Sequence, residues 1–211
     1  MFSSILPKKT NVLACSIVAL LAIVLVKTYI WDSDSFVLKC IVSTVDGEKY
    51  CVRDRNKLKE AADLLAEVTD KCKQLVEHVK QKYPDDELVQ KLAKGSRPEK
   101  ITETLPTSKH TAFSENKGKK IAFCLNKEKH NNDSLIDEQT LTFVAIHELA
   151  HVMTKSIGHK RDFWENFKFL LEEAKESNIY QPVDYKASPQ RYCGMDITDN
   201  PYYDYRLGSW G

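Results

Sequence analysis

The spacing of hydrophobic and polar residues predicts an α+β chain preceded by a separate apolar segment. Short β-branched stretches beside turn residues such as Asp46-Gly47 predict strands, and apolar residues at intervals of three and four predict amphipathic helices. The residues up to Thr107 that follow the second helix are predicted to be irregular, and the tail from Ile179 is predicted to lie on the domain as ordered coil. The predicted strands cover residues 36–44, 49–53, 110–114 and 120–125, and the predicted helices cover 56–82, 85–94, 135–156 and 160–177.

The N-terminal segment is the most apolar stretch of the chain. No charged residue occurs from Asn11 to Val26, and Lys27 follows. A bilayer crossing takes roughly 20 apolar residues, and a terminal lysine can extend its ammonium group to the lipid headgroups. We therefore predict a single-pass transmembrane helix over residues 11–31, after a short tail at residues 1–10. A cleaved signal peptide and a buried core helix are the alternatives; no small-residue cleavage pattern follows the run, which argues against the first.

Charged residues on either side of this segment indicate an orientation. Lys8 and Lys9 precede it, whereas Asp32 and Asp34 follow it. Because positive charge favours the cytosolic side of a membrane, the remaining domain, residues 36–211, is expected outside the cytoplasm.

The overall charge balance disfavours a nucleic-acid partner. The chain carries 31 Lys and Arg against 30 Asp and Glu, which gives a net charge of +1. Proteins that bind nucleic acid typically concentrate positive charge on one face or tail, and this sequence has no Lys/Arg-rich tail. We expect no nucleic-acid partner, and the oligomeric state stays open.

The cysteines do not form a zinc-binding pattern. None of the six lies in a Cys-x-x-Cys pair, which argues against a cysteine-based zinc knuckle. Cys40 and Cys51 lie on either side of the Asp46-Gly47 turn at similar distances, so a disulfide between them depends on the strand register. The disulfide pairing is otherwise open among Cys40, Cys51, Cys72, Cys124 and Cys193.

The candidate chemistry lies in the segment His147-Glu148-Leu149-Ala150-His151. Residues four apart on a helix share one face, so the two imidazoles can bind one ion. Zinc accepts imidazole nitrogen, and catalytic sites keep a position open for water. Glu148 is rotated about 100° from His147 around the helix, so it can act as general base beside the metal. Such a pattern also occurs by chance on solvated helices, but here an apolar helix and a nearby third histidine surround it.

His159 is the leading candidate for the third ligand. It follows Gly158, where the chain can reverse and return a side chain to the first two histidines. Glu172 and Glu173 of the final predicted helix are the competing ligands. The other histidines, His78, His110 and His130, are predicted to be surface residues.

The run HELAHVMTKSIGHKRDFWENF resembles the zincin family that includes the WLM and SprT-like metallopeptidases. It is more similar still to uncharacterised predicted metallopeptidases of large DNA viruses and some protists, with the core motif at residues 121–178. The resemblance implies a zincin-like α+β domain, in which a small antiparallel sheet packs on helices. It also implies Zn²⁺ ligands at His147, His151 and His159, with Glu148 as base. The spacing before His159 is longer than in WLM proteins, and Thr154 and Ile157 replace the glycine and histidine of metzincins.

Two supporting roles stay open. Asp162 can hydrogen-bond a ligand histidine, or it can simply stabilise the start of its helix. One tyrosine of the tail can stabilise the oxyanion of peptide hydrolysis, as in other zincins; the candidates are Tyr192, Tyr202, Tyr203 and Tyr205.

These observations predict a zinc metallopeptidase, anchored in a host or virion membrane, that hydrolyses a protein or peptide substrate through a zinc-bound water with Glu148 as general base. One alternative is a non-catalytic, zinc-stabilised structural or adaptor protein of a membrane or virion, which has no need of Glu148. A second alternative is a DNA–protein crosslink protease like the WLM and SprT-like relatives, which the neutral charge disfavours.

Overall fold

The computed structural model describes residues 8–34, 38–97, 101–115, 118, 120–131 and 133–208. The chain separates into one unit up to Val37 and a second unit from Leu38 onward. The first unit contains helix α1, Lys8–Asp34. Residues 1–7 of the predicted tail, and residues 36 and 37 of the first predicted strand, lie outside the described part.

The prediction of a transmembrane anchor is wrong. Within the described chain, none of the helices combines the length and the apolar character that a bilayer crossing requires. The uncharged run from Asn11 to Val26 spans 16 residues before Lys27 interrupts it, which is shorter than the roughly 20 residues that cross a hydrocarbon core. The single-pass membrane localisation predicted from this segment is corrected accordingly.

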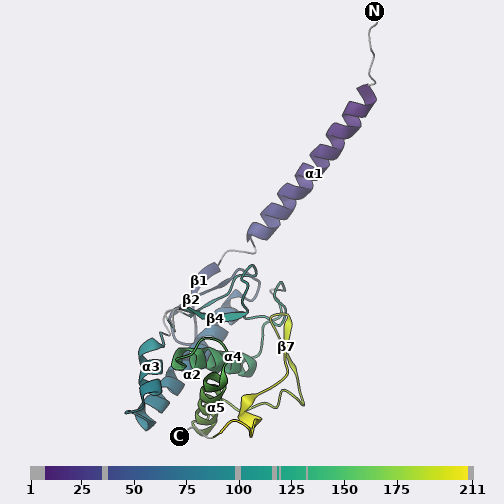
Figure 1. Cartoon of the computed structure of the whole chain (residues 1–211). Coiled ribbons are helices and arrows are strands. Elements are labelled where there is room, and N and C mark those ends of the chain that lie inside the picture. Colours follow the sequence, from purple (N-terminus) through teal and green to yellow (C-terminus); the bar gives the residue numbers. More distant parts are fainter. Residues whose placement is uncertain are drawn as a thin grey trace, which may run out of the picture. The chain divides into compact units, whose positions relative to one another are not determined.

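Four helices build the second unit, with α4 at the centre of the group (Figure 1). Helix α2 ends just before Pro84 because proline cannot continue a helix, and the Asp86 side chain caps α3 by accepting from the amides of Leu88 and Val89. Helix α4 contacts the other three helices, and its apolar residues therefore occur on nearly every face. The bounds are Leu58–Lys82 for α2, Glu87–Gly95 for α3, Glu138–Met153 for α4 and Arg161–Glu176 for α5.

The strands form small separate sheets. Strands β1, Leu38–Val42, and β2, Lys49–Arg53, pair as the predicted hairpin, and Gly47 adopts the positive φ of +75° that the turn needs. The three-stranded sheet has the order β3-β5-β4, with β4, Ala112–Glu115, at an edge and antiparallel to β5, Lys120–Phe123. Strand β3, Ile101–Glu103, runs parallel to β5 in a region predicted to be irregular.

The C-terminal tail is more structured than its sequence indicates. Strands β6, Gln190–Tyr192, and β7, Met195–Ile197, form a tight hairpin, and the short 3-10 helix η2 covers Pro201–Tyr203. Each of these strands has three residues, which is too short for an alternating pattern to be recognised in the sequence. The prediction of coil for the tail is therefore wrong over the β6–β7 hairpin.

Two disulfides connect these elements. The register of the first hairpin places Cys40 opposite Cys51, and the two are bonded. Cys124, directly after β5, is bonded to Cys193 in the turn of the β6–β7 hairpin. Among the described cysteines, Cys72 is a buried free thiol on α2.

A buried charged network joins the two larger sheets. Arg53 is the last residue of β2 and Arg55 follows two positions later. Both arginines form ion pairs with Glu103 of β3, and all three side chains are shielded from solvent. The Glu103 carboxylate also accepts from the backbone amide of Arg53 at 2.6 Å. Because isolated charges are costly in a protein interior, this network fixes how the first hairpin sits on the three-stranded sheet.

With helices packed on small sheets, the α+β prediction is confirmed.

Candidate metal centre

Helix α4 positions His147, Glu148 and His151. Its first turn is capped by Asp137, whose carboxylate accepts from the Thr140 amide at 2.8 Å. The four-residue spacing places the two imidazoles on one face, with ring centroids 4.9 Å apart. The helix thus presents both histidines toward the same point, as the sequence predicts.

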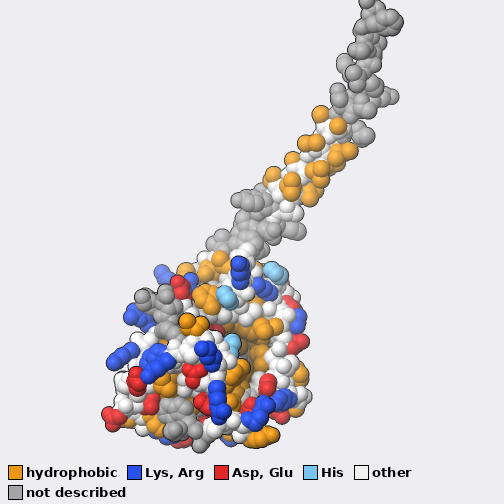
Figure 2. All heavy atoms as spheres, in the orientation of Figure 1, with side chains coloured by type: hydrophobic (Ala, Val, Ile, Leu, Met, Phe, Trp, Pro, Cys, Tyr) orange, Lys and Arg blue, Asp and Glu red, His pale blue; other side chains and the backbone are white. Residues whose placement is uncertain are grey.

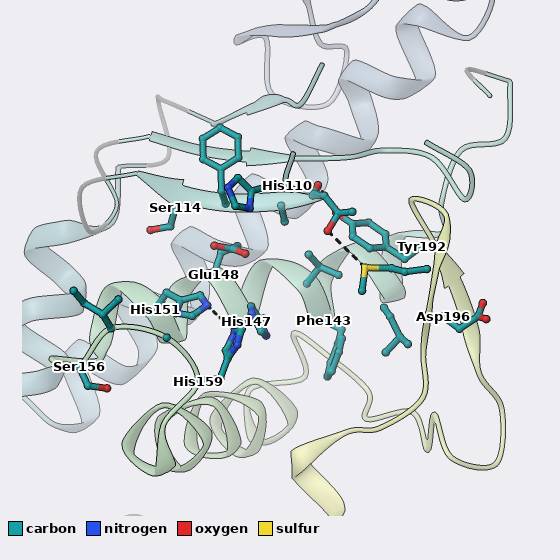
Figure 3. Close-up of a pocket in the computed structure, with 18 residues that line it drawn as sticks. His110, Ser114, Phe143, His147, Glu148, His151, Ser156, His159, Tyr192 and Asp196 are labelled. Atoms are coloured by element: carbon teal, nitrogen blue, oxygen red, sulfur yellow. Dashed lines mark hydrogen bonds between the residues drawn. The ribbon is translucent and has the colours of Figure 1, made fainter. Parts of the chain in front are cut away.

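The chain after α4 reverses and returns His159 to these two rings. Gly158, at a φ of +79°, makes the turn immediately before it. The His159 Nε2 atom lies 3.1 Å from His147 Nε2 and 3.1 Å from His151 Nε2. In Figure 3 the three imidazoles point toward one another, although His159 comes from a different segment than the other two.

This arrangement fits a zinc ion. Tetrahedral zinc with Zn–N bonds of about 2.0–2.1 Å separates neighbouring ligand nitrogens by about 3.3 Å, close to the 3.1 Å between these Nε2 atoms. The three imidazole nitrogens, one from each histidine, all lie within 4.8 Å of one another. Imidazole nitrogens in such an arrangement are a donor set that suits zinc.

Aromatic residues of α5 hold the histidines in place. Phe163 is fully buried, and its ring centroid lies 4.9 Å from that of His147, 4.3 Å from that of His151 and 4.6 Å from that of His159. Trp164 donates from its indole nitrogen to the His159 carbonyl at 3.1 Å. Packing on a rigid apolar base restricts the imidazole rotamers, so the three nitrogens are preorganised for an ion.

Burial keeps the site in the protonation state that metal binding needs. Desolvation lowers the pKa of His147 to about 3, and the neighbouring His151 and His159 act in the same direction. Burial also lowers the pKa of His159. Because only a neutral imidazole offers a lone pair to a cation, these rings are suited to bind metal at neutral pH.

Glu148 lies beside this cluster but is not part of it. Its side chain is only 5% exposed, and burial raises its pKa to about 8. A cation held by the histidines would lower that pKa again, since a nearby opposite charge favours the carboxylate. Glu148 extends from α4 into the space between the helix and β4 (Figure 3), so it faces the same pocket as the three imidazoles.

A pocket of about 840 Å³ opens over the histidines and Glu148. Its lining comes from strand β4 and the residues before it, from α4, from the loop of residues 156–159 and from the β6–β7 hairpin. Figure 2 shows the hollow on the drawn face, with hydrophobic side chains gathered inside it. The volume lies within the range of about 300–1,000 Å³ that is usual for ligand-binding pockets.

The hairpin wall is fixed to the rest of the domain. The amides of Cys193 and Gly194 donate to the carbonyls of Asn126 and Lys127, both at 2.9 Å. The Tyr192 hydroxyl donates to the Thr111 carbonyl at 3.2 Å, and burial together with the Glu148 charge raises the Tyr192 pKa. With the Cys124–Cys193 disulfide, these contacts hold the hairpin against the segment directly before β4 and the segment that follows β5.

The competing carboxylate ligands are not brought to the histidines. Glu173 binds the ammonium of Lys82 at 3.0 Å and accepts from the Tyr83 hydroxyl at 2.8 Å. It also lies 3.0 Å from His78, and Glu176 completes a second His/Glu group. The Lys82 ammonium also pairs with Glu176, so it bridges the two carboxylates of this group. Glu172 is outside the pocket lining and lies 4.0 Å from Lys168.

The structure also shows the contacts of Asp162 and of the tail tyrosines, for which supporting roles were predicted. Asp162 accepts a hydrogen bond from the Ser156 hydroxyl at 2.7 Å, in the loop that carries His159. Of the tyrosine candidates, Tyr192 lines the pocket, whereas Tyr202 and Tyr203 bind Lys175 and the Pro182 carbonyl. Tyr205 is exposed.

Sequence reasoning missed the residues of the pocket walls. His110 was predicted to be a surface residue; it is exposed, but it also lines the pocket directly before β4. Met195 and Ile197 come from the hairpin, in a tail that was predicted to be ordered coil. No motif marks these positions, because they reach the site through strand pairing and a disulfide.

The chain is similar to proteins of large DNA viruses. An uncharacterised protein of Acanthamoeba polyphaga mimivirus is 28% identical over 191 residues, which cover 88% of this chain and 95% of the relative. An uncharacterised protein of Invertebrate iridescent virus 6 is 34% identical over 82 residues, 39% of this chain and 44% of that protein. A third, from Invertebrate iridescent virus 3, is 39% identical over 59 residues, 28% of this chain and 36% of that protein.

No protein-family model matches the chain, and no solved structure matches it. The similarity to uncharacterised viral proteins is therefore confirmed and supports the prediction of a viral protein. No family comparison supports a WLM or SprT-like zincin, so that resemblance stays a prediction.

Proposed function

We propose that this chain is a zinc metallopeptidase with a zincin-like catalytic domain, in which His147, His151 and His159 hold the ion and Glu148 is the general base. The observation that carries the proposal is the convergence of three Nε2 atoms, with two separations of 3.1 Å, beside a buried carboxyl group in an open pocket. Structural zinc sites normally have four protein ligands, whereas catalytic sites have three and leave one position for water or substrate. The three-histidine set therefore favours catalysis over a purely structural role.

The residues of the pocket have separate tasks in this mechanism. Bound zinc would polarise the scissile carbonyl and lower the pKa of a water molecule. Glu148 accepts the proton of the attacking water and transfers it to the nitrogen of the leaving amine. The Phe163 ring beneath the histidines excludes solvent from their far side. Excluding solvent strengthens the electrostatic interactions at the reacting atoms.

The position of β4 supports a peptide as substrate. This strand lies at the edge of its sheet and borders the pocket next to Glu148. An exposed strand edge can bind an extended peptide through backbone hydrogen bonds. A peptide held along β4 would carry its backbone across the pocket and past the histidines.

The proposal is tested with the full chain, purified without chelator. We expect about one zinc ion per chain by elemental analysis, and cleavage of denatured casein followed by the appearance of new termini. Glu148→Gln should retain zinc and lose cleavage by about 10²–10⁴-fold, since it removes the general base but no ligand. Glu172→Gln is the matched control, because this carboxylate lies outside the pocket, and it should cleave like the wild type.

Absence of zinc would remove the central claim. Equal cleavage by the wild-type and Glu148→Gln proteins would show that the site is not the catalyst. Stoichiometric zinc with no cleavage of any substrate would favour the structural alternative.

A further inference from the structure

The pocket is chemically asymmetric. The histidines and Glu148 occupy one end, and the other end is lined by Phe143 and Val144 of α4 together with Met195 and Ile197 of β7. In Figure 3, Phe143 lies beyond His147 on the side of the hairpin, and Asp196 points away from the centre of the pocket. A group held at the histidines therefore has an apolar compartment next to it.

Among the described residues, neither lysine nor arginine lines this compartment to balance an acidic substrate residue, and the base of the pocket lining outside the three-histidine cluster is His110, directly before β4. Lys and Arg are missing from the pocket lining within the described part of the chain. The carboxylates of the lining are Glu148 and Asp196, and Asp196 is exposed and paired with Arg191 at 3.3 Å. An acidic side chain entering here would lose water without gaining a partner, which is unfavourable.

The wall of this compartment is preformed. The β6–β7 turn uses Cys193 and Gly194 at φ values of 50° and 83°, so the two strands reverse tightly. The Thr111 hydroxyl lies 3.7 Å from the Met195 sulfur and connects the hairpin with the segment directly before β4. A wall held by a disulfide and hydrogen bonds keeps its shape, and a fixed apolar wall discriminates between side chains better than a mobile one.

We propose that this apolar compartment selects substrates with a large apolar side chain next to the scissile bond, and that Met195 and Ile197 of the hairpin set this preference. The inference rests on the proposed peptidase function and adds a substrate class to it. Losing one methylene contact in an apolar pocket changes kcat/KM by about 10–200-fold. We therefore expect Leu, Met or Phe at the selected position to exceed Ala, Asp and Lys by at least tenfold.

The preference is measured with the zinc-loaded full chain and a peptide library in which each position is varied, with products read by mass spectrometry. Met195→Lys and Ile197→Lys place a cation in the wall and should shift the preference toward Asp or Glu at the same substrate position. Met195 is 51% exposed, so its substitution does not disturb the core. Thr198→Lys is the matched control: it adds the same charge at the next residue along the chain, outside the pocket lining, and should leave the preference unchanged.

A binding experiment separates this inference from the proposed function. Glu148→Gln protein is titrated with fluorescent peptides that differ only at the selected position, and anisotropy should show tighter binding of the apolar peptide. If no peptide is cleaved in a Glu148-dependent way, the peptidase proposal fails, whatever the binding shows. If cleavage depends on Glu148 but favours charged or small residues, the apolar compartment is refuted. An apolar preference that both lysine variants leave unchanged would refute the role of the hairpin.

Discussion

The Cys124–Cys193 disulfide should stabilise the domain more than the Cys40–Cys51 disulfide does. The first bond joins residues 69 positions apart, and the second joins residues 11 positions apart. In the chain-entropy description, a bond that closes a longer loop removes more conformational freedom from the unfolded chain. The corresponding contributions are roughly 4.4 kcal/mol for the long loop and roughly 2.8 kcal/mol for the short one. The two bonds thus differ by about 1.6 kcal/mol, which a denaturation experiment resolves.

The test compares two double variants, Cys124→Ala/Cys193→Ala and Cys40→Ala/Cys51→Ala, in urea without reductant. Substituting both partners leaves no new free thiol that can form a different bond. Unfolding is followed by tryptophan fluorescence, and native-state hydrogen exchange reports on the amides of residues 190–197. We expect faster exchange of these amides only in the first variant, because Cys193 lies in the turn of that hairpin.

Two results would contradict this reasoning. The first is a Cys124/Cys193 variant that loses no more stability than the Cys40/Cys51 variant. The second is unchanged exchange in the hairpin after the long-range bond is removed, which would mean that hydrogen bonds alone hold the pocket wall.

Three further predictions follow from buried groups and from the histidine cluster. Burial raises the pKa of the Cys72 thiol from 9.0 to about 12. The stability that this thiol contributes is therefore present below about pH 9, and it is lost at about 1.4 kcal/mol per pH unit as the pH rises toward 12. Urea unfolding at pH 8 and pH 10 should show this loss in the wild type and a smaller loss in Cys72→Ala. Glu103→Gln leaves two buried arginines without a counter-charge and should lower the free energy of unfolding by about 3–5 kcal/mol, whereas an unchanged urea midpoint would contradict the assigned network. His159→Ala should weaken zinc binding by more than the roughly 10–100-fold that is typical when a residue behind a metal ligand is changed. Competition with a chromophoric chelator measures this affinity. Glu172→Ala should leave the affinity unchanged, and the opposite result would assign the third ligand to α5.

The sequence predicted the elements that depend on local patterns. Helices α2, α3 and α5 have clear amphipathic periods because each buries one face, whereas α4 is a long apolar stretch that is buried on nearly every face. The observed bounds of all four helices lie within a few residues of the predicted ones. The Asp46-Gly47 turn identified the first hairpin because glycine adopts its positive φ without strain. The apolar segment before residue 32 has the composition of a membrane span, but its uncharged run is shorter than a bilayer crossing requires.

Short elements that depend on distant partners were not predictable. Strand β3 has three residues, and it is a strand only because it pairs with β5, whose residues lie about twenty positions later in the chain. The β6–β7 hairpin depends on a bond from Cys193 to Cys124, and five cysteines outside the N-terminal segment allowed several pairings. Such contacts carry little local signal, since their energy comes from residues far away in the sequence.

By itself, the sequence determined that His147, Glu148 and His151 share a helix, because their spacing follows directly from the helical repeat. It also favoured His159 as the third ligand over the competing carboxylates Glu172 and Glu173. Only the tertiary structure brought His159 to within 3.1 Å of both helix histidines, and it placed Glu173 against Lys82 instead. The pocket wall, too, was decided by tertiary contacts, because a disulfide and strand pairing bring the hairpin from the end of the chain to the site. Periodicity encodes which residues face one side of an element, whereas the packing of elements against one another decides which of those faces meet.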